Sequence, residues 1–460
     1  MRKNGAFLCL SSATAVLWLG IVVCVMSGHP GIFPDTPSYE VNQVGRIAFA
    51  GDATRAWPVP LVFALSSSYR IQALLQAAVY GAGWTAVIWA FMPRWRTKVC
   101  AVASAGIVLL ALSPLYLQWT LTVLSEAITL GFLLLGVAGA QAVFVRLERG
   151  GRATPTTWLL VAGTIAALGM AAMNRLPLLV IMLAVCAVVL VRAWRFRVQA
   201  VAVAMAISVL LMSAYVAWLN GRINETWMPL SRPGTYYGYL TATSDEAQEN
   251  KLADQLHAYM ATRVPACLPP IRAAAKADPG NLGSTITSKC PEAVEWLRQE
   301  FTGEYLKFVV THPSYTAAYF IDLLPKVGYR GRRTTGYVAV NSILPAPLAG
   351  LFVTVREDKA SQQGDHDAYV PIILWTFVGF AAATMELLGR RRGNAQAAPN
   401  AVAIAAMAAS PIALLATLLT LNSETARITS QSSALLLASV ILVSGGLADR
   451  LFTSRSAAES

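Results

Sequence analysis

The carboxylate of Asp35 is the strongest candidate for chemistry in this sequence. It lies in the stretch Phe33-Pro-Asp-Thr-Pro-Ser-Tyr-Glu40, in which Asp35 or Thr36 can cap a helix that begins at Pro37. At helical spacing Asp35 and Tyr39 then share a polar face, and apolar residues fall on the opposite face. The pattern predicts a helix that lies on a membrane surface and presents a carboxylate among lipid headgroups. A role for Asp35 as a helix cap alone explains the same residues equally well.

Glu126 is a second acidic group of interest because it falls inside an apolar run. It comes about eight residues into a predicted membrane crossing, ~12 Å from the outer surface, on a helical stripe with Thr122 and Thr129. A carboxylate at that depth is costly and usually faces a polar cavity, which favours a functional role. The alternative is a purely structural ion pair with Arg175.

Two arginines at the ends of apolar runs could bind an anion. Arg175 ends one predicted crossing, and Glu424 and Arg427 stand at helical spacing at the end of a later one. A guanidinium offers forked donors that suit a phosphate entering from the membrane. The alternative is that both arginines simply extend to the lipid headgroups.

The composition indicates that the chain lives in a membrane. Of its 460 residues, 56% are hydrophobic and only 13% are charged, against about a quarter charged in soluble domains. Its apolar runs, each able to cross ~30 Å of hydrocarbon, predict ten transmembrane helices. These cover residues 6–27, 71–92, 98–113, 118–145, 157–173, 177–194, 198–219, 369–389, 401–421 and 431–448.

The net charge of +12 reports orientation, and we expect no nucleic-acid partner. The basic residues lie in every second short connection, which is the positive-inside distribution and places both termini in the cytoplasm. The first apolar run is too long for the core of a cleaved signal peptide, so we expect a retained anchor. The basic residues include Arg2, Lys3, Arg94, Arg96, Lys98, Arg146, Arg149, Arg152, Arg192, Arg195, Arg197, Arg390, Arg391, Arg392, Arg450 and Arg455.

Two outer segments are too long to be simple turns and divide the chain into three parts. We predict an N-terminal transmembrane module of seven helices, 1–219, whose outer loop 28–70 carries the catalytic helix. A mainly helical extracytoplasmic insertion, 220–368, follows, and a C-terminal module of three transmembrane helices, 369–460, completes the chain. The predicted fold class is therefore an all-α polytopic membrane protein.

The insertion combines helical patterns with two cysteines. Apolar residues recur at helical spacing after Pro291 until His312-Pro313 interrupts them, and a further helix follows. Cys267 and Cys290 fall on the side of the membrane where disulfides persist, so we expect them to pair. Two free thiols are the alternative.

The sequence assigns no cofactor. Asp365-His366-Asp367 could ligate a divalent cation, although a charged loop before a helix explains the same residues. No phosphate-binding loop, dinucleotide motif, zinc-protease motif or nucleophile elbow stands at an interpretable place. A divalent cation is therefore the one cofactor candidate.

The order of several short motifs resembles the GT-C superfamily of polytopic membrane glycosyltransferases. This superfamily includes protein O-mannosyltransferases, the aminoarabinose transferase of lipid A and mycobacterial arabinosyltransferases. The resemblance rests on the order of the motifs along the chain. They are Pro34-Asp-Thr-Pro-Ser-Tyr39, Trp57-Pro-Val-Pro60, Leu124-Ser-Glu-Ala127, the stretch 306–315 with its His312-Pro-Ser-Tyr315, and Ser423-Glu-Thr-Ala-Arg427.

The resemblance implies an inverting glycosyltransferase in a bacterial cytoplasmic membrane, with its active site on the extracytoplasmic face. It would move a sugar from a polyprenyl-phosphate donor to a glycan, lipid or protein acceptor, with Asp35 as the base. One carboxylate suffices, because the phosphate leaves without protonation when cations or a metal stabilise its charge. The residues expected to contact the substrates are Tyr39, Glu126, Arg175, Glu424 and Arg427.

Three other functions stay open. A transporter or flippase would line its path with Glu126 and Arg175, and it should show paired halves with broken helices, which the sequence does not reveal. A polymerase or ligase of envelope polysaccharide would place its basic residues in the large outer loops. A non-catalytic scaffold is favoured if Asp35 tolerates replacement by alanine.

Overall fold

The protein is described from a computed structural model. The structure describes residues 2–27, 30, 39, 55–148, 153–196, 198–227, 255–256, 258–267, 288–323, 354–357, 366–369, 372–391, 400–420 and 425–458.

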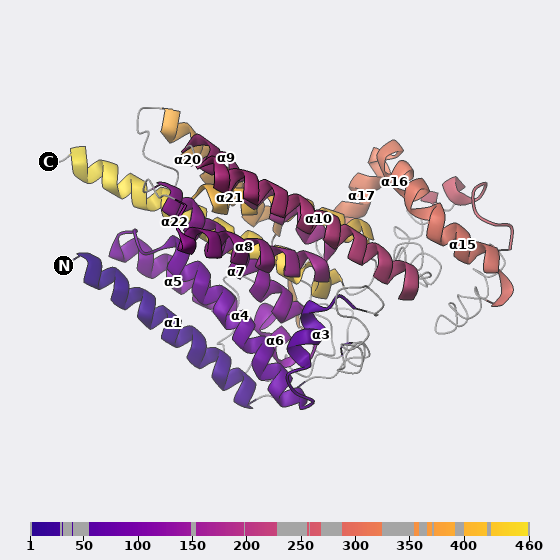
Figure 1. Cartoon of the computed structure of the whole chain (residues 1–460), viewed down its shortest axis with the longest axis horizontal. Coiled ribbons are helices and arrows are strands. Elements are labelled where there is room, and N and C mark those ends of the chain that lie inside the picture. The colour runs from indigo at the N-terminus through magenta and orange to yellow at the C-terminus, as the bar shows by residue number, and fades with distance from the viewer. Residues whose placement is uncertain are drawn as a thin grey trace.

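Most of the described chain forms one bundle of long helices (Figure 1). Its core is a single cluster of buried apolar side chains, among which Trp84 and Tyr80 of α4 and Tyr116 of α6 are the largest fully buried ones. The bundle helices are α1 (Arg2–Ser27), α3 (Pro58–Phe63), α4 (Tyr69–Phe91), α5 (Thr97–Leu112), α6 (Pro114–Leu121), α7 (Glu126–Glu148), α8 (Pro155–Asn174), the 3-10 turn η3 (Leu176–Leu178), α9 (Leu179–Arg195), α10 (Gln199–Trp227), α20 (Ile372–Arg391), α21 (Ala401–Thr420) and α22 (Thr425–Ala458).

Seven of these helices are long and apolar enough to cross a membrane, judged by length and composition. They belong to α1, α4, α7, α8, α9 with its preceding turn, α10 and α22. Three shorter apolar helices, Thr97–Leu112, Leu374–Met385 and Ala401–Thr417, stand where the sequence predicted crossings three, eight and nine. A polytopic membrane protein is therefore supported, whereas the predicted count of ten spans is not confirmed. The described helix α10 also continues to Trp227, beyond the expected end of the first module at 219.

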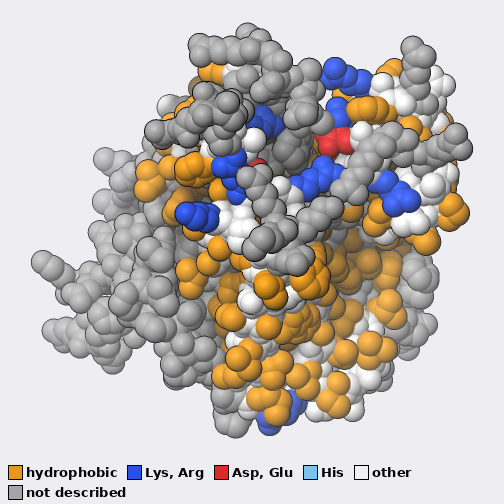
Figure 2. Space-filling model, turned by 90° about the vertical axis from the view of Figure 1, so that its left-hand side faces the viewer, with side chains coloured by type: hydrophobic (Ala, Val, Ile, Leu, Met, Phe, Trp, Pro, Cys, Tyr) orange, Lys and Arg blue, Asp and Glu red, His pale blue; other side chains and the backbone are white. Residues whose placement is uncertain are grey.

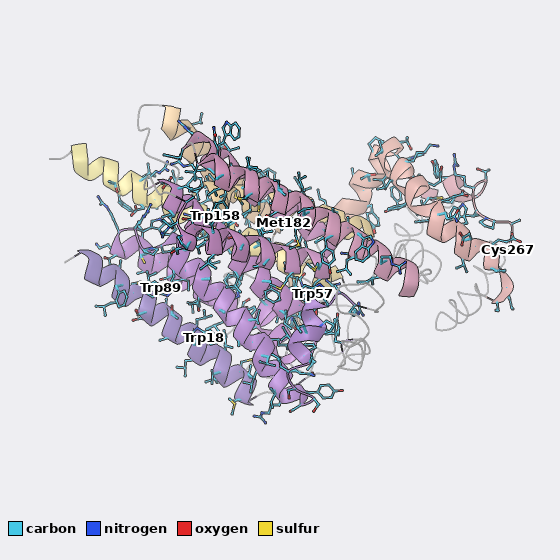
Figure 3. All side chains as sticks on the ribbon, viewed as in Figure 1. Trp18, Trp57, Trp89, Trp158, Met182 and Cys267 are labelled. Atoms are coloured by element: carbon cyan, nitrogen blue, oxygen red, sulfur yellow. A yellow bond between two sulfur atoms is a disulfide. The ribbon has the colours of Figure 1, made fainter. Side chains whose placement is uncertain are left out.

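Helices α1 and α4 run in opposite directions, as two hydrogen bonds between them show. Trp18 of α1 donates to Thr85 of α4 at 3.1 Å, and Trp89 of α4 donates back to Thr14 at 3.0 Å, which ties the two helices antiparallel (Figure 3). Both chain termini lie at one end of the bundle, the termini end, and the insertion extends from the opposite end, the insertion end (Figure 1).

The termini end carries many of the basic side chains. Figure 2 looks onto this end and shows Lys and Arg side chains gathered over the upper part of the face, above a hydrophobic flank. Glu148, at the end of α7, pairs there with Arg192 at 2.9 Å and Arg94 at 3.6 Å. The arrangement accords with the basic connections that predict a cytoplasmic face, and that orientation stays a prediction.

The described residues of the insertion include three longer helices, a short helical stretch at 258–260 and one disulfide. Helices α15 (Pro291–Gln299), α16 (Phe301–Thr311) and α17 (Pro313–Leu323) follow the predicted pattern, including the interruption at His312-Pro313. Cys267 and Cys290 form the expected disulfide. The cysteine prediction is confirmed.

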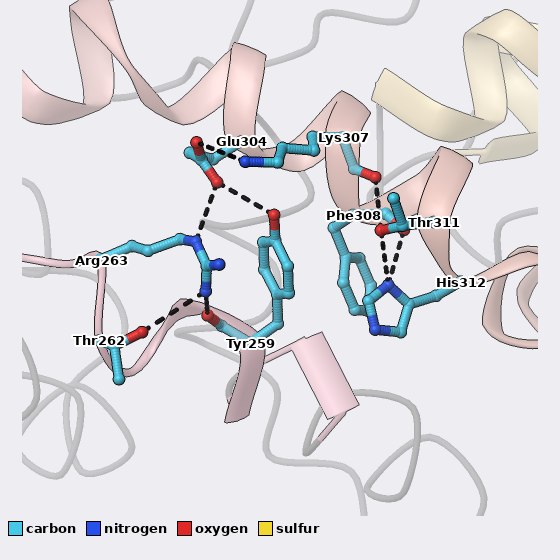
Figure 4. Close-up of polar contacts among 8 residues, drawn as sticks. All are labelled: Tyr259, Thr262, Arg263, Glu304, Lys307, Phe308, Thr311 and His312. Atoms are coloured by element: carbon cyan, nitrogen blue, oxygen red, sulfur yellow. Dashed lines mark hydrogen bonds and ion pairs between the residues drawn. The ribbon is translucent and has the colours of Figure 1, made fainter.

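A polar cluster joins the segment around Tyr259 to α16 (Figure 4). The Glu304 carboxylate accepts a hydrogen bond from the Tyr259 hydroxyl and pairs with Nε of Arg263, both at 3.0 Å. The Arg263 guanidinium also lies 3.9 Å from the centre of the Tyr259 ring. Burial, followed by the bond to Glu304, raises the pKa of Tyr259, so its phenol stays a donor. The cluster fixes the disulfide-linked segment on α16.

One short part of the mainly helical insertion forms strands. Strands β1 (Thr354–Glu357) and β2 (His366–Tyr369) pair antiparallel, with Thr354 opposite Tyr369. Thr, Val and Tyr are residue types that favour strands, and they occur in these two segments. His366 therefore belongs to a strand, and the expected charged loop directly before a helix is wrong at this residue.

The predicted fourth crossing, 118–145, is also wrong as a continuous helix. Helix α6 ends at Leu121, residues 122–125 are not helical, and α7 begins at Glu126. Helix α6 is packed inside the bundle against α1, α4, α5, α7 and α22. The stripe of Thr122, Glu126 and Thr129 on one helix consequently does not form, because Thr122 precedes α7.

A polar stripe on α4 satisfies the backbone at this break. The NH2 group of Gln76 donates to the carbonyls of Trp119, Thr120 and Thr122 at 3.2, 2.6 and 2.8 Å, where α6 ends, with one of its two N–H groups shared between two carbonyls. One turn away, the Tyr80 hydroxyl donates to Ala111 O at 2.6 Å, near the end of α5. Helix ends leave carbonyls without helical partners, and in a bilayer each unsatisfied group costs several kcal/mol. The stripe therefore makes a helix break possible inside the bundle.

We predict that Gln76→Leu destabilises the protein by about 2 to 4 kcal/mol, since buried carbonyls left unsatisfied cost about 1 to 3 kcal/mol each. Thermal unfolding in detergent, followed by tryptophan fluorescence, measures the loss. Gln199→Leu is the matched control, because Gln199 is exposed at the start of α10. An unchanged midpoint for Gln76→Leu would contradict the role assigned to this side chain.

Candidate functional site

A buried ion pair stands at the start of the central helix. Oε1 of Glu126, in the first turn of α7, lies 2.8 Å from Nη2 of Arg175, and their side chains are 1% and 17% exposed. Helix α7 is the most enclosed of the seven long apolar helices, because 72% of its apolar 18-residue stretch is buried. A carboxylate in the first turn is favoured by the helix dipole, and Arg175 balances its charge. The pair thus places two opposite charges at the insertion end of the bundle core.

The chain around Arg175 is shaped to release this side chain from its helix. Helix α8 ends at Asn174, and Arg175 adopts an extended backbone before the turn that contains Pro177. Proline cannot continue the hydrogen-bond pattern of the helix. Asn220 of α10 donates to Met173 O at 3.3 Å and satisfies one carbonyl at this helix end. The Arg175 guanidinium is therefore directed by the end of α8 toward the start of α7.

Tyr39 of the first outer segment reaches the same place. It is 4% exposed, and its hydroxyl donates to Oγ of Ser125 at 3.2 Å. Nη2 of Arg175 donates to the same oxygen at 3.4 Å. The ring meets Phe63 of α3 edge-on, and the Arg55 guanidinium lies 5.1 Å from its centre. Residues from three distant parts of the sequence thus meet around Ser125.

The structure brings together three of the six residues expected to act on substrates, namely Tyr39, Glu126 and Arg175. Asp35 and Glu424 lie outside the described residues. Arg427 belongs to the first turn of α22, although the position of its side chain is likewise outside the described part.

Two residues at the site were not singled out from the sequence. Ser125 precedes α7, and its carbonyl accepts from Thr129 N at 2.8 Å, which makes it the cap residue. Serine directly before an apolar run is a helix-start signal, so Ser125-Glu126 could have indicated the break. Arg55 has no such signal, because its approach to Tyr39 depends on tertiary structure alone.

Several polar atoms near the ion pair have no hydrogen-bond partner among the described residues. They are Nε of Arg175, Nδ2 of Asn174 and Oγ1 of Thr129. Native proteins satisfy nearly all buried polar groups with protein atoms or ordered water. Two of these three atoms can only donate, which suits water or a ligand rich in acceptor oxygens.

The described residues contain no group of three or more His, Cys, Asp and Glu side chains that could hold a metal ion. Asp365 is outside these residues, so the proposed cation ligands at 365–367 stay untested. The chemistry available around Ser125 is that of a carboxylate, guanidinium groups and hydroxyls.

The comparisons with known proteins give one structural match. No protein-family model matches the chain, and no curated protein matches its sequence. A crystal structure of ArnT from Cupriavidus metallidurans, bound to undecaprenyl phosphate, aligns with 97% of this chain and 78% of its own. The identity is 15% and the TM-score is 0.30.

We predict that the two charges of the ion pair depend on each other for stability. Arg175→Gln should lower the free energy of unfolding by about 3 to 5 kcal/mol, because it leaves a buried carboxylate without its cation. The double variant Glu126→Gln with Arg175→Gln should recover most of that loss, as measured by thermal unfolding in detergent.

The matched control for this cycle is the pair formed by Glu148 and Arg192 at the termini end, which is also largely buried. It shows what neutralising an ion pair elsewhere in the same bundle costs. The losses of stability in the single variants Glu126→Gln and Arg175→Gln should therefore not add in the double variant. If they add, the two side chains are not energetically coupled, and the prediction that each charge depends on the other is wrong.

Proposed function

We propose that the chain is an integral membrane glycosyltransferase that moves a sugar from a polyprenyl-phosphate donor to an extracytoplasmic glycan, lipid or protein. The observation that carries this proposal is the contact of Tyr39 with Ser125, beside the Glu126–Arg175 pair. Tyr39 ends the Pro-Asp-Thr-Pro-Ser-Tyr motif, and Ser125 and Glu126 belong to a second motif of the resemblance. Two motifs that the sequence separates by 86 residues therefore meet in space.

In this proposal Asp35 is the base. Its carboxylate takes the proton from an acceptor hydroxyl, the hydroxyl oxygen forms a bond to the anomeric carbon, and the bond from that carbon to the donor phosphate breaks. The configuration at the anomeric carbon inverts. Asp35 precedes Tyr39 by four residues, which limits the distance between their Cα atoms to about 14 Å. The chain therefore ties the proposed base to Tyr39, whose hydroxyl contacts Ser125.

The leaving polyprenyl phosphate requires positive charge. Arg175 can supply it through Nε, which has no hydrogen-bond partner among the described residues. Arg55 brings a second guanidinium to Tyr39, and Arg427, with Glu424 nearby in sequence, is proposed to complete the site from α22. A developing phosphate charge is stabilised most effectively by such preorganised donors away from bulk water. A divalent cation stays a possible addition to this set.

The orientation that belongs to this proposal places both termini in the cytoplasm of a bacterium. The insertion, 220–368, would then stand outside the cytoplasmic membrane and bind the acceptor. The disulfide between Cys267 and Cys290 favours an oxidising compartment on that side. An envelope polysaccharide polymerase or ligase would share this orientation and differ in its acceptor.

A transporter is a second candidate because one observation favours it. The break between α6 and α7 is the kind of discontinuous helix that transporters place at their binding sites, and charged side chains adjoin it. Transporter folds pair such breaks in two related halves. The described C-terminal helices offer only Pro411 inside α21 as an irregularity, and α21 continues through it.

We predict that Asp35→Asn abolishes sugar transfer in membranes supplied with a polyprenyl-phosphate sugar, while expression and folding stay at the level of the unmodified protein. The amide keeps the size and shape of the side chain and one acceptor oxygen, and it removes the base. Product is measured as labelled sugar released from the lipid fraction into the acceptor fraction.

Asp52→Asn, in the same outer segment, is the matched control and should retain most of the activity. Transfer that persists in Asp35→Asn would discard the base assignment. Lipid-linked sugar that crosses the membrane of proteoliposomes without any transfer would favour the transporter.

A further inference from the structure

The hydroxyl of Ser125 accepts hydrogen bonds from both Tyr39 and Arg175. We propose that Ser125 is a positioning residue that docks Tyr39 beside the ion pair, and that this contact limits how far the carboxylate of Asp35, four residues earlier in the chain, can lie from the cations. The catalytic part of this inference rests on the proposed glycosyltransferase function, whereas the docking part does not.

The geometry of Ser125 makes its oxygen a fixed point. The residue is 3% exposed, and its own carbonyl begins the hydrogen-bond ladder of α7 by accepting from Thr129 N at 2.8 Å. The preceding break is held in turn by Gln76, which binds the carbonyl of Thr122. The bundle therefore sets the position of the hydroxyl independently of the outer segment.

Counting bonds shows why this hydroxyl can join two partners. A serine hydroxyl accepts two hydrogen bonds and donates one. The Tyr39 hydroxyl and Nη2 of Arg175 donate to Ser125 and occupy both acceptor positions. Its hydrogen is then available to donate to a third group, such as an oxygen of a bound substrate. The arrangement thus links Tyr39 and the Arg175 cation through one oxygen atom.

Tyr39 is equally constrained from its side. Its ring contacts Phe63 edge-on, with 6.1 Å between the ring centres, and the Arg55 guanidinium lies 5.1 Å from the ring centre. With the ring enclosed in this way, the hydroxyl is the atom that reaches Ser125. Loss of either oxygen removes the same hydrogen bond, so the two losses should not add.

The release of the segment can be measured without sugar transfer. Trypsin must bind the Arg55 side chain to cut after it, and the Arg55 guanidinium lies over the Tyr39 ring, so the rate of this cut reports the release of Tyr39. Ser125→Ala and Tyr39→Phe should each speed the appearance of the peptide that ends at Arg55 by about fivefold, the effect of one ordinary hydrogen bond. The double variant should cut no faster than Ser125→Ala, and Ser125→Thr, which keeps a hydroxyl, should restore most of the protection.

Ser104→Ala is the matched control, since Ser104 is a buried serine on α5 that contacts Cys9 and Ala101. Its cleavage rate should not change. Unchanged protection in both Ser125→Ala and Tyr39→Phe, or rates that multiply in the double variant, would overturn the docking role. If Ser125→Ala does not fold, Tyr39→Phe alone decides the question, because it removes a single oxygen.

The role in transfer is tested separately on the same variants. Loosening the segment should lower kcat for sugar transfer about fivefold and change KM for the lipid donor much less, because Arg175 stays in place. A rise of about fivefold in KM for the lipid donor, with kcat unchanged, would mean that Ser125 binds the lipid donor, and it would overturn the positioning role. Increased cleavage in a chain that transfers no sugar under any condition would keep the docking role and reject the proposed function.

Discussion

The break between α6 and α7 depends on one constraint: backbone groups inside a membrane bundle must find partners without water. Gln76 meets this constraint for the end of α6 by donating to three carbonyls, and Tyr80, one turn along α4, serves the end of α5. A continuous helix would satisfy its own backbone and need neither side chain. The break is useful because it creates a new helix start in the bundle core, which exposes the first residues of α7 to other groups.

The charges of the site follow from that helix start. Glu126 occupies the first turn of α7, where the helix dipole favours an anion. Arg175, which directly follows the last residue of α8, pairs with it. A buried ion pair contributes little to stability by itself, because desolvation offsets much of the attraction. Within the described part of the chain, Nε of Arg175 and other buried polar atoms have no hydrogen-bond partner, which fits preparation for a ligand better than a source of folding energy.

The sequence predicts the parts of this arrangement that depend on local pattern. Long apolar runs, the helices after Pro291 and the pairing of Cys267 with Cys290 all agree with the structure. The break at 122–125 escaped prediction because its residues are apolar or weakly polar and hydropathy averages over them. Ser125 carries a helix-start signal in the sequence, but residues 118–145 around it are apolar enough to be predicted as one continuous crossing. The contact of Tyr39 with Ser125 joins residues 86 positions apart, and no local pattern specifies it. Single-sequence hydropathy likewise does not find the short β1–β2 pair, which has only four residues in each strand.

The central claim is that the start of α7 at the insertion end receives the phosphate of a polyprenyl lipid. Photo-cross-linking tests it most directly, with a polyprenyl phosphate that carries a diazirine next to its phosphate and with mass spectrometry of the labelled peptides. The account predicts label on the peptides that contain Ser125 and Arg175, and competition by unlabelled polyprenyl phosphate should remove it. Label confined to the termini end, or label near Ser125 that the unlabelled lipid does not displace, would contradict the account.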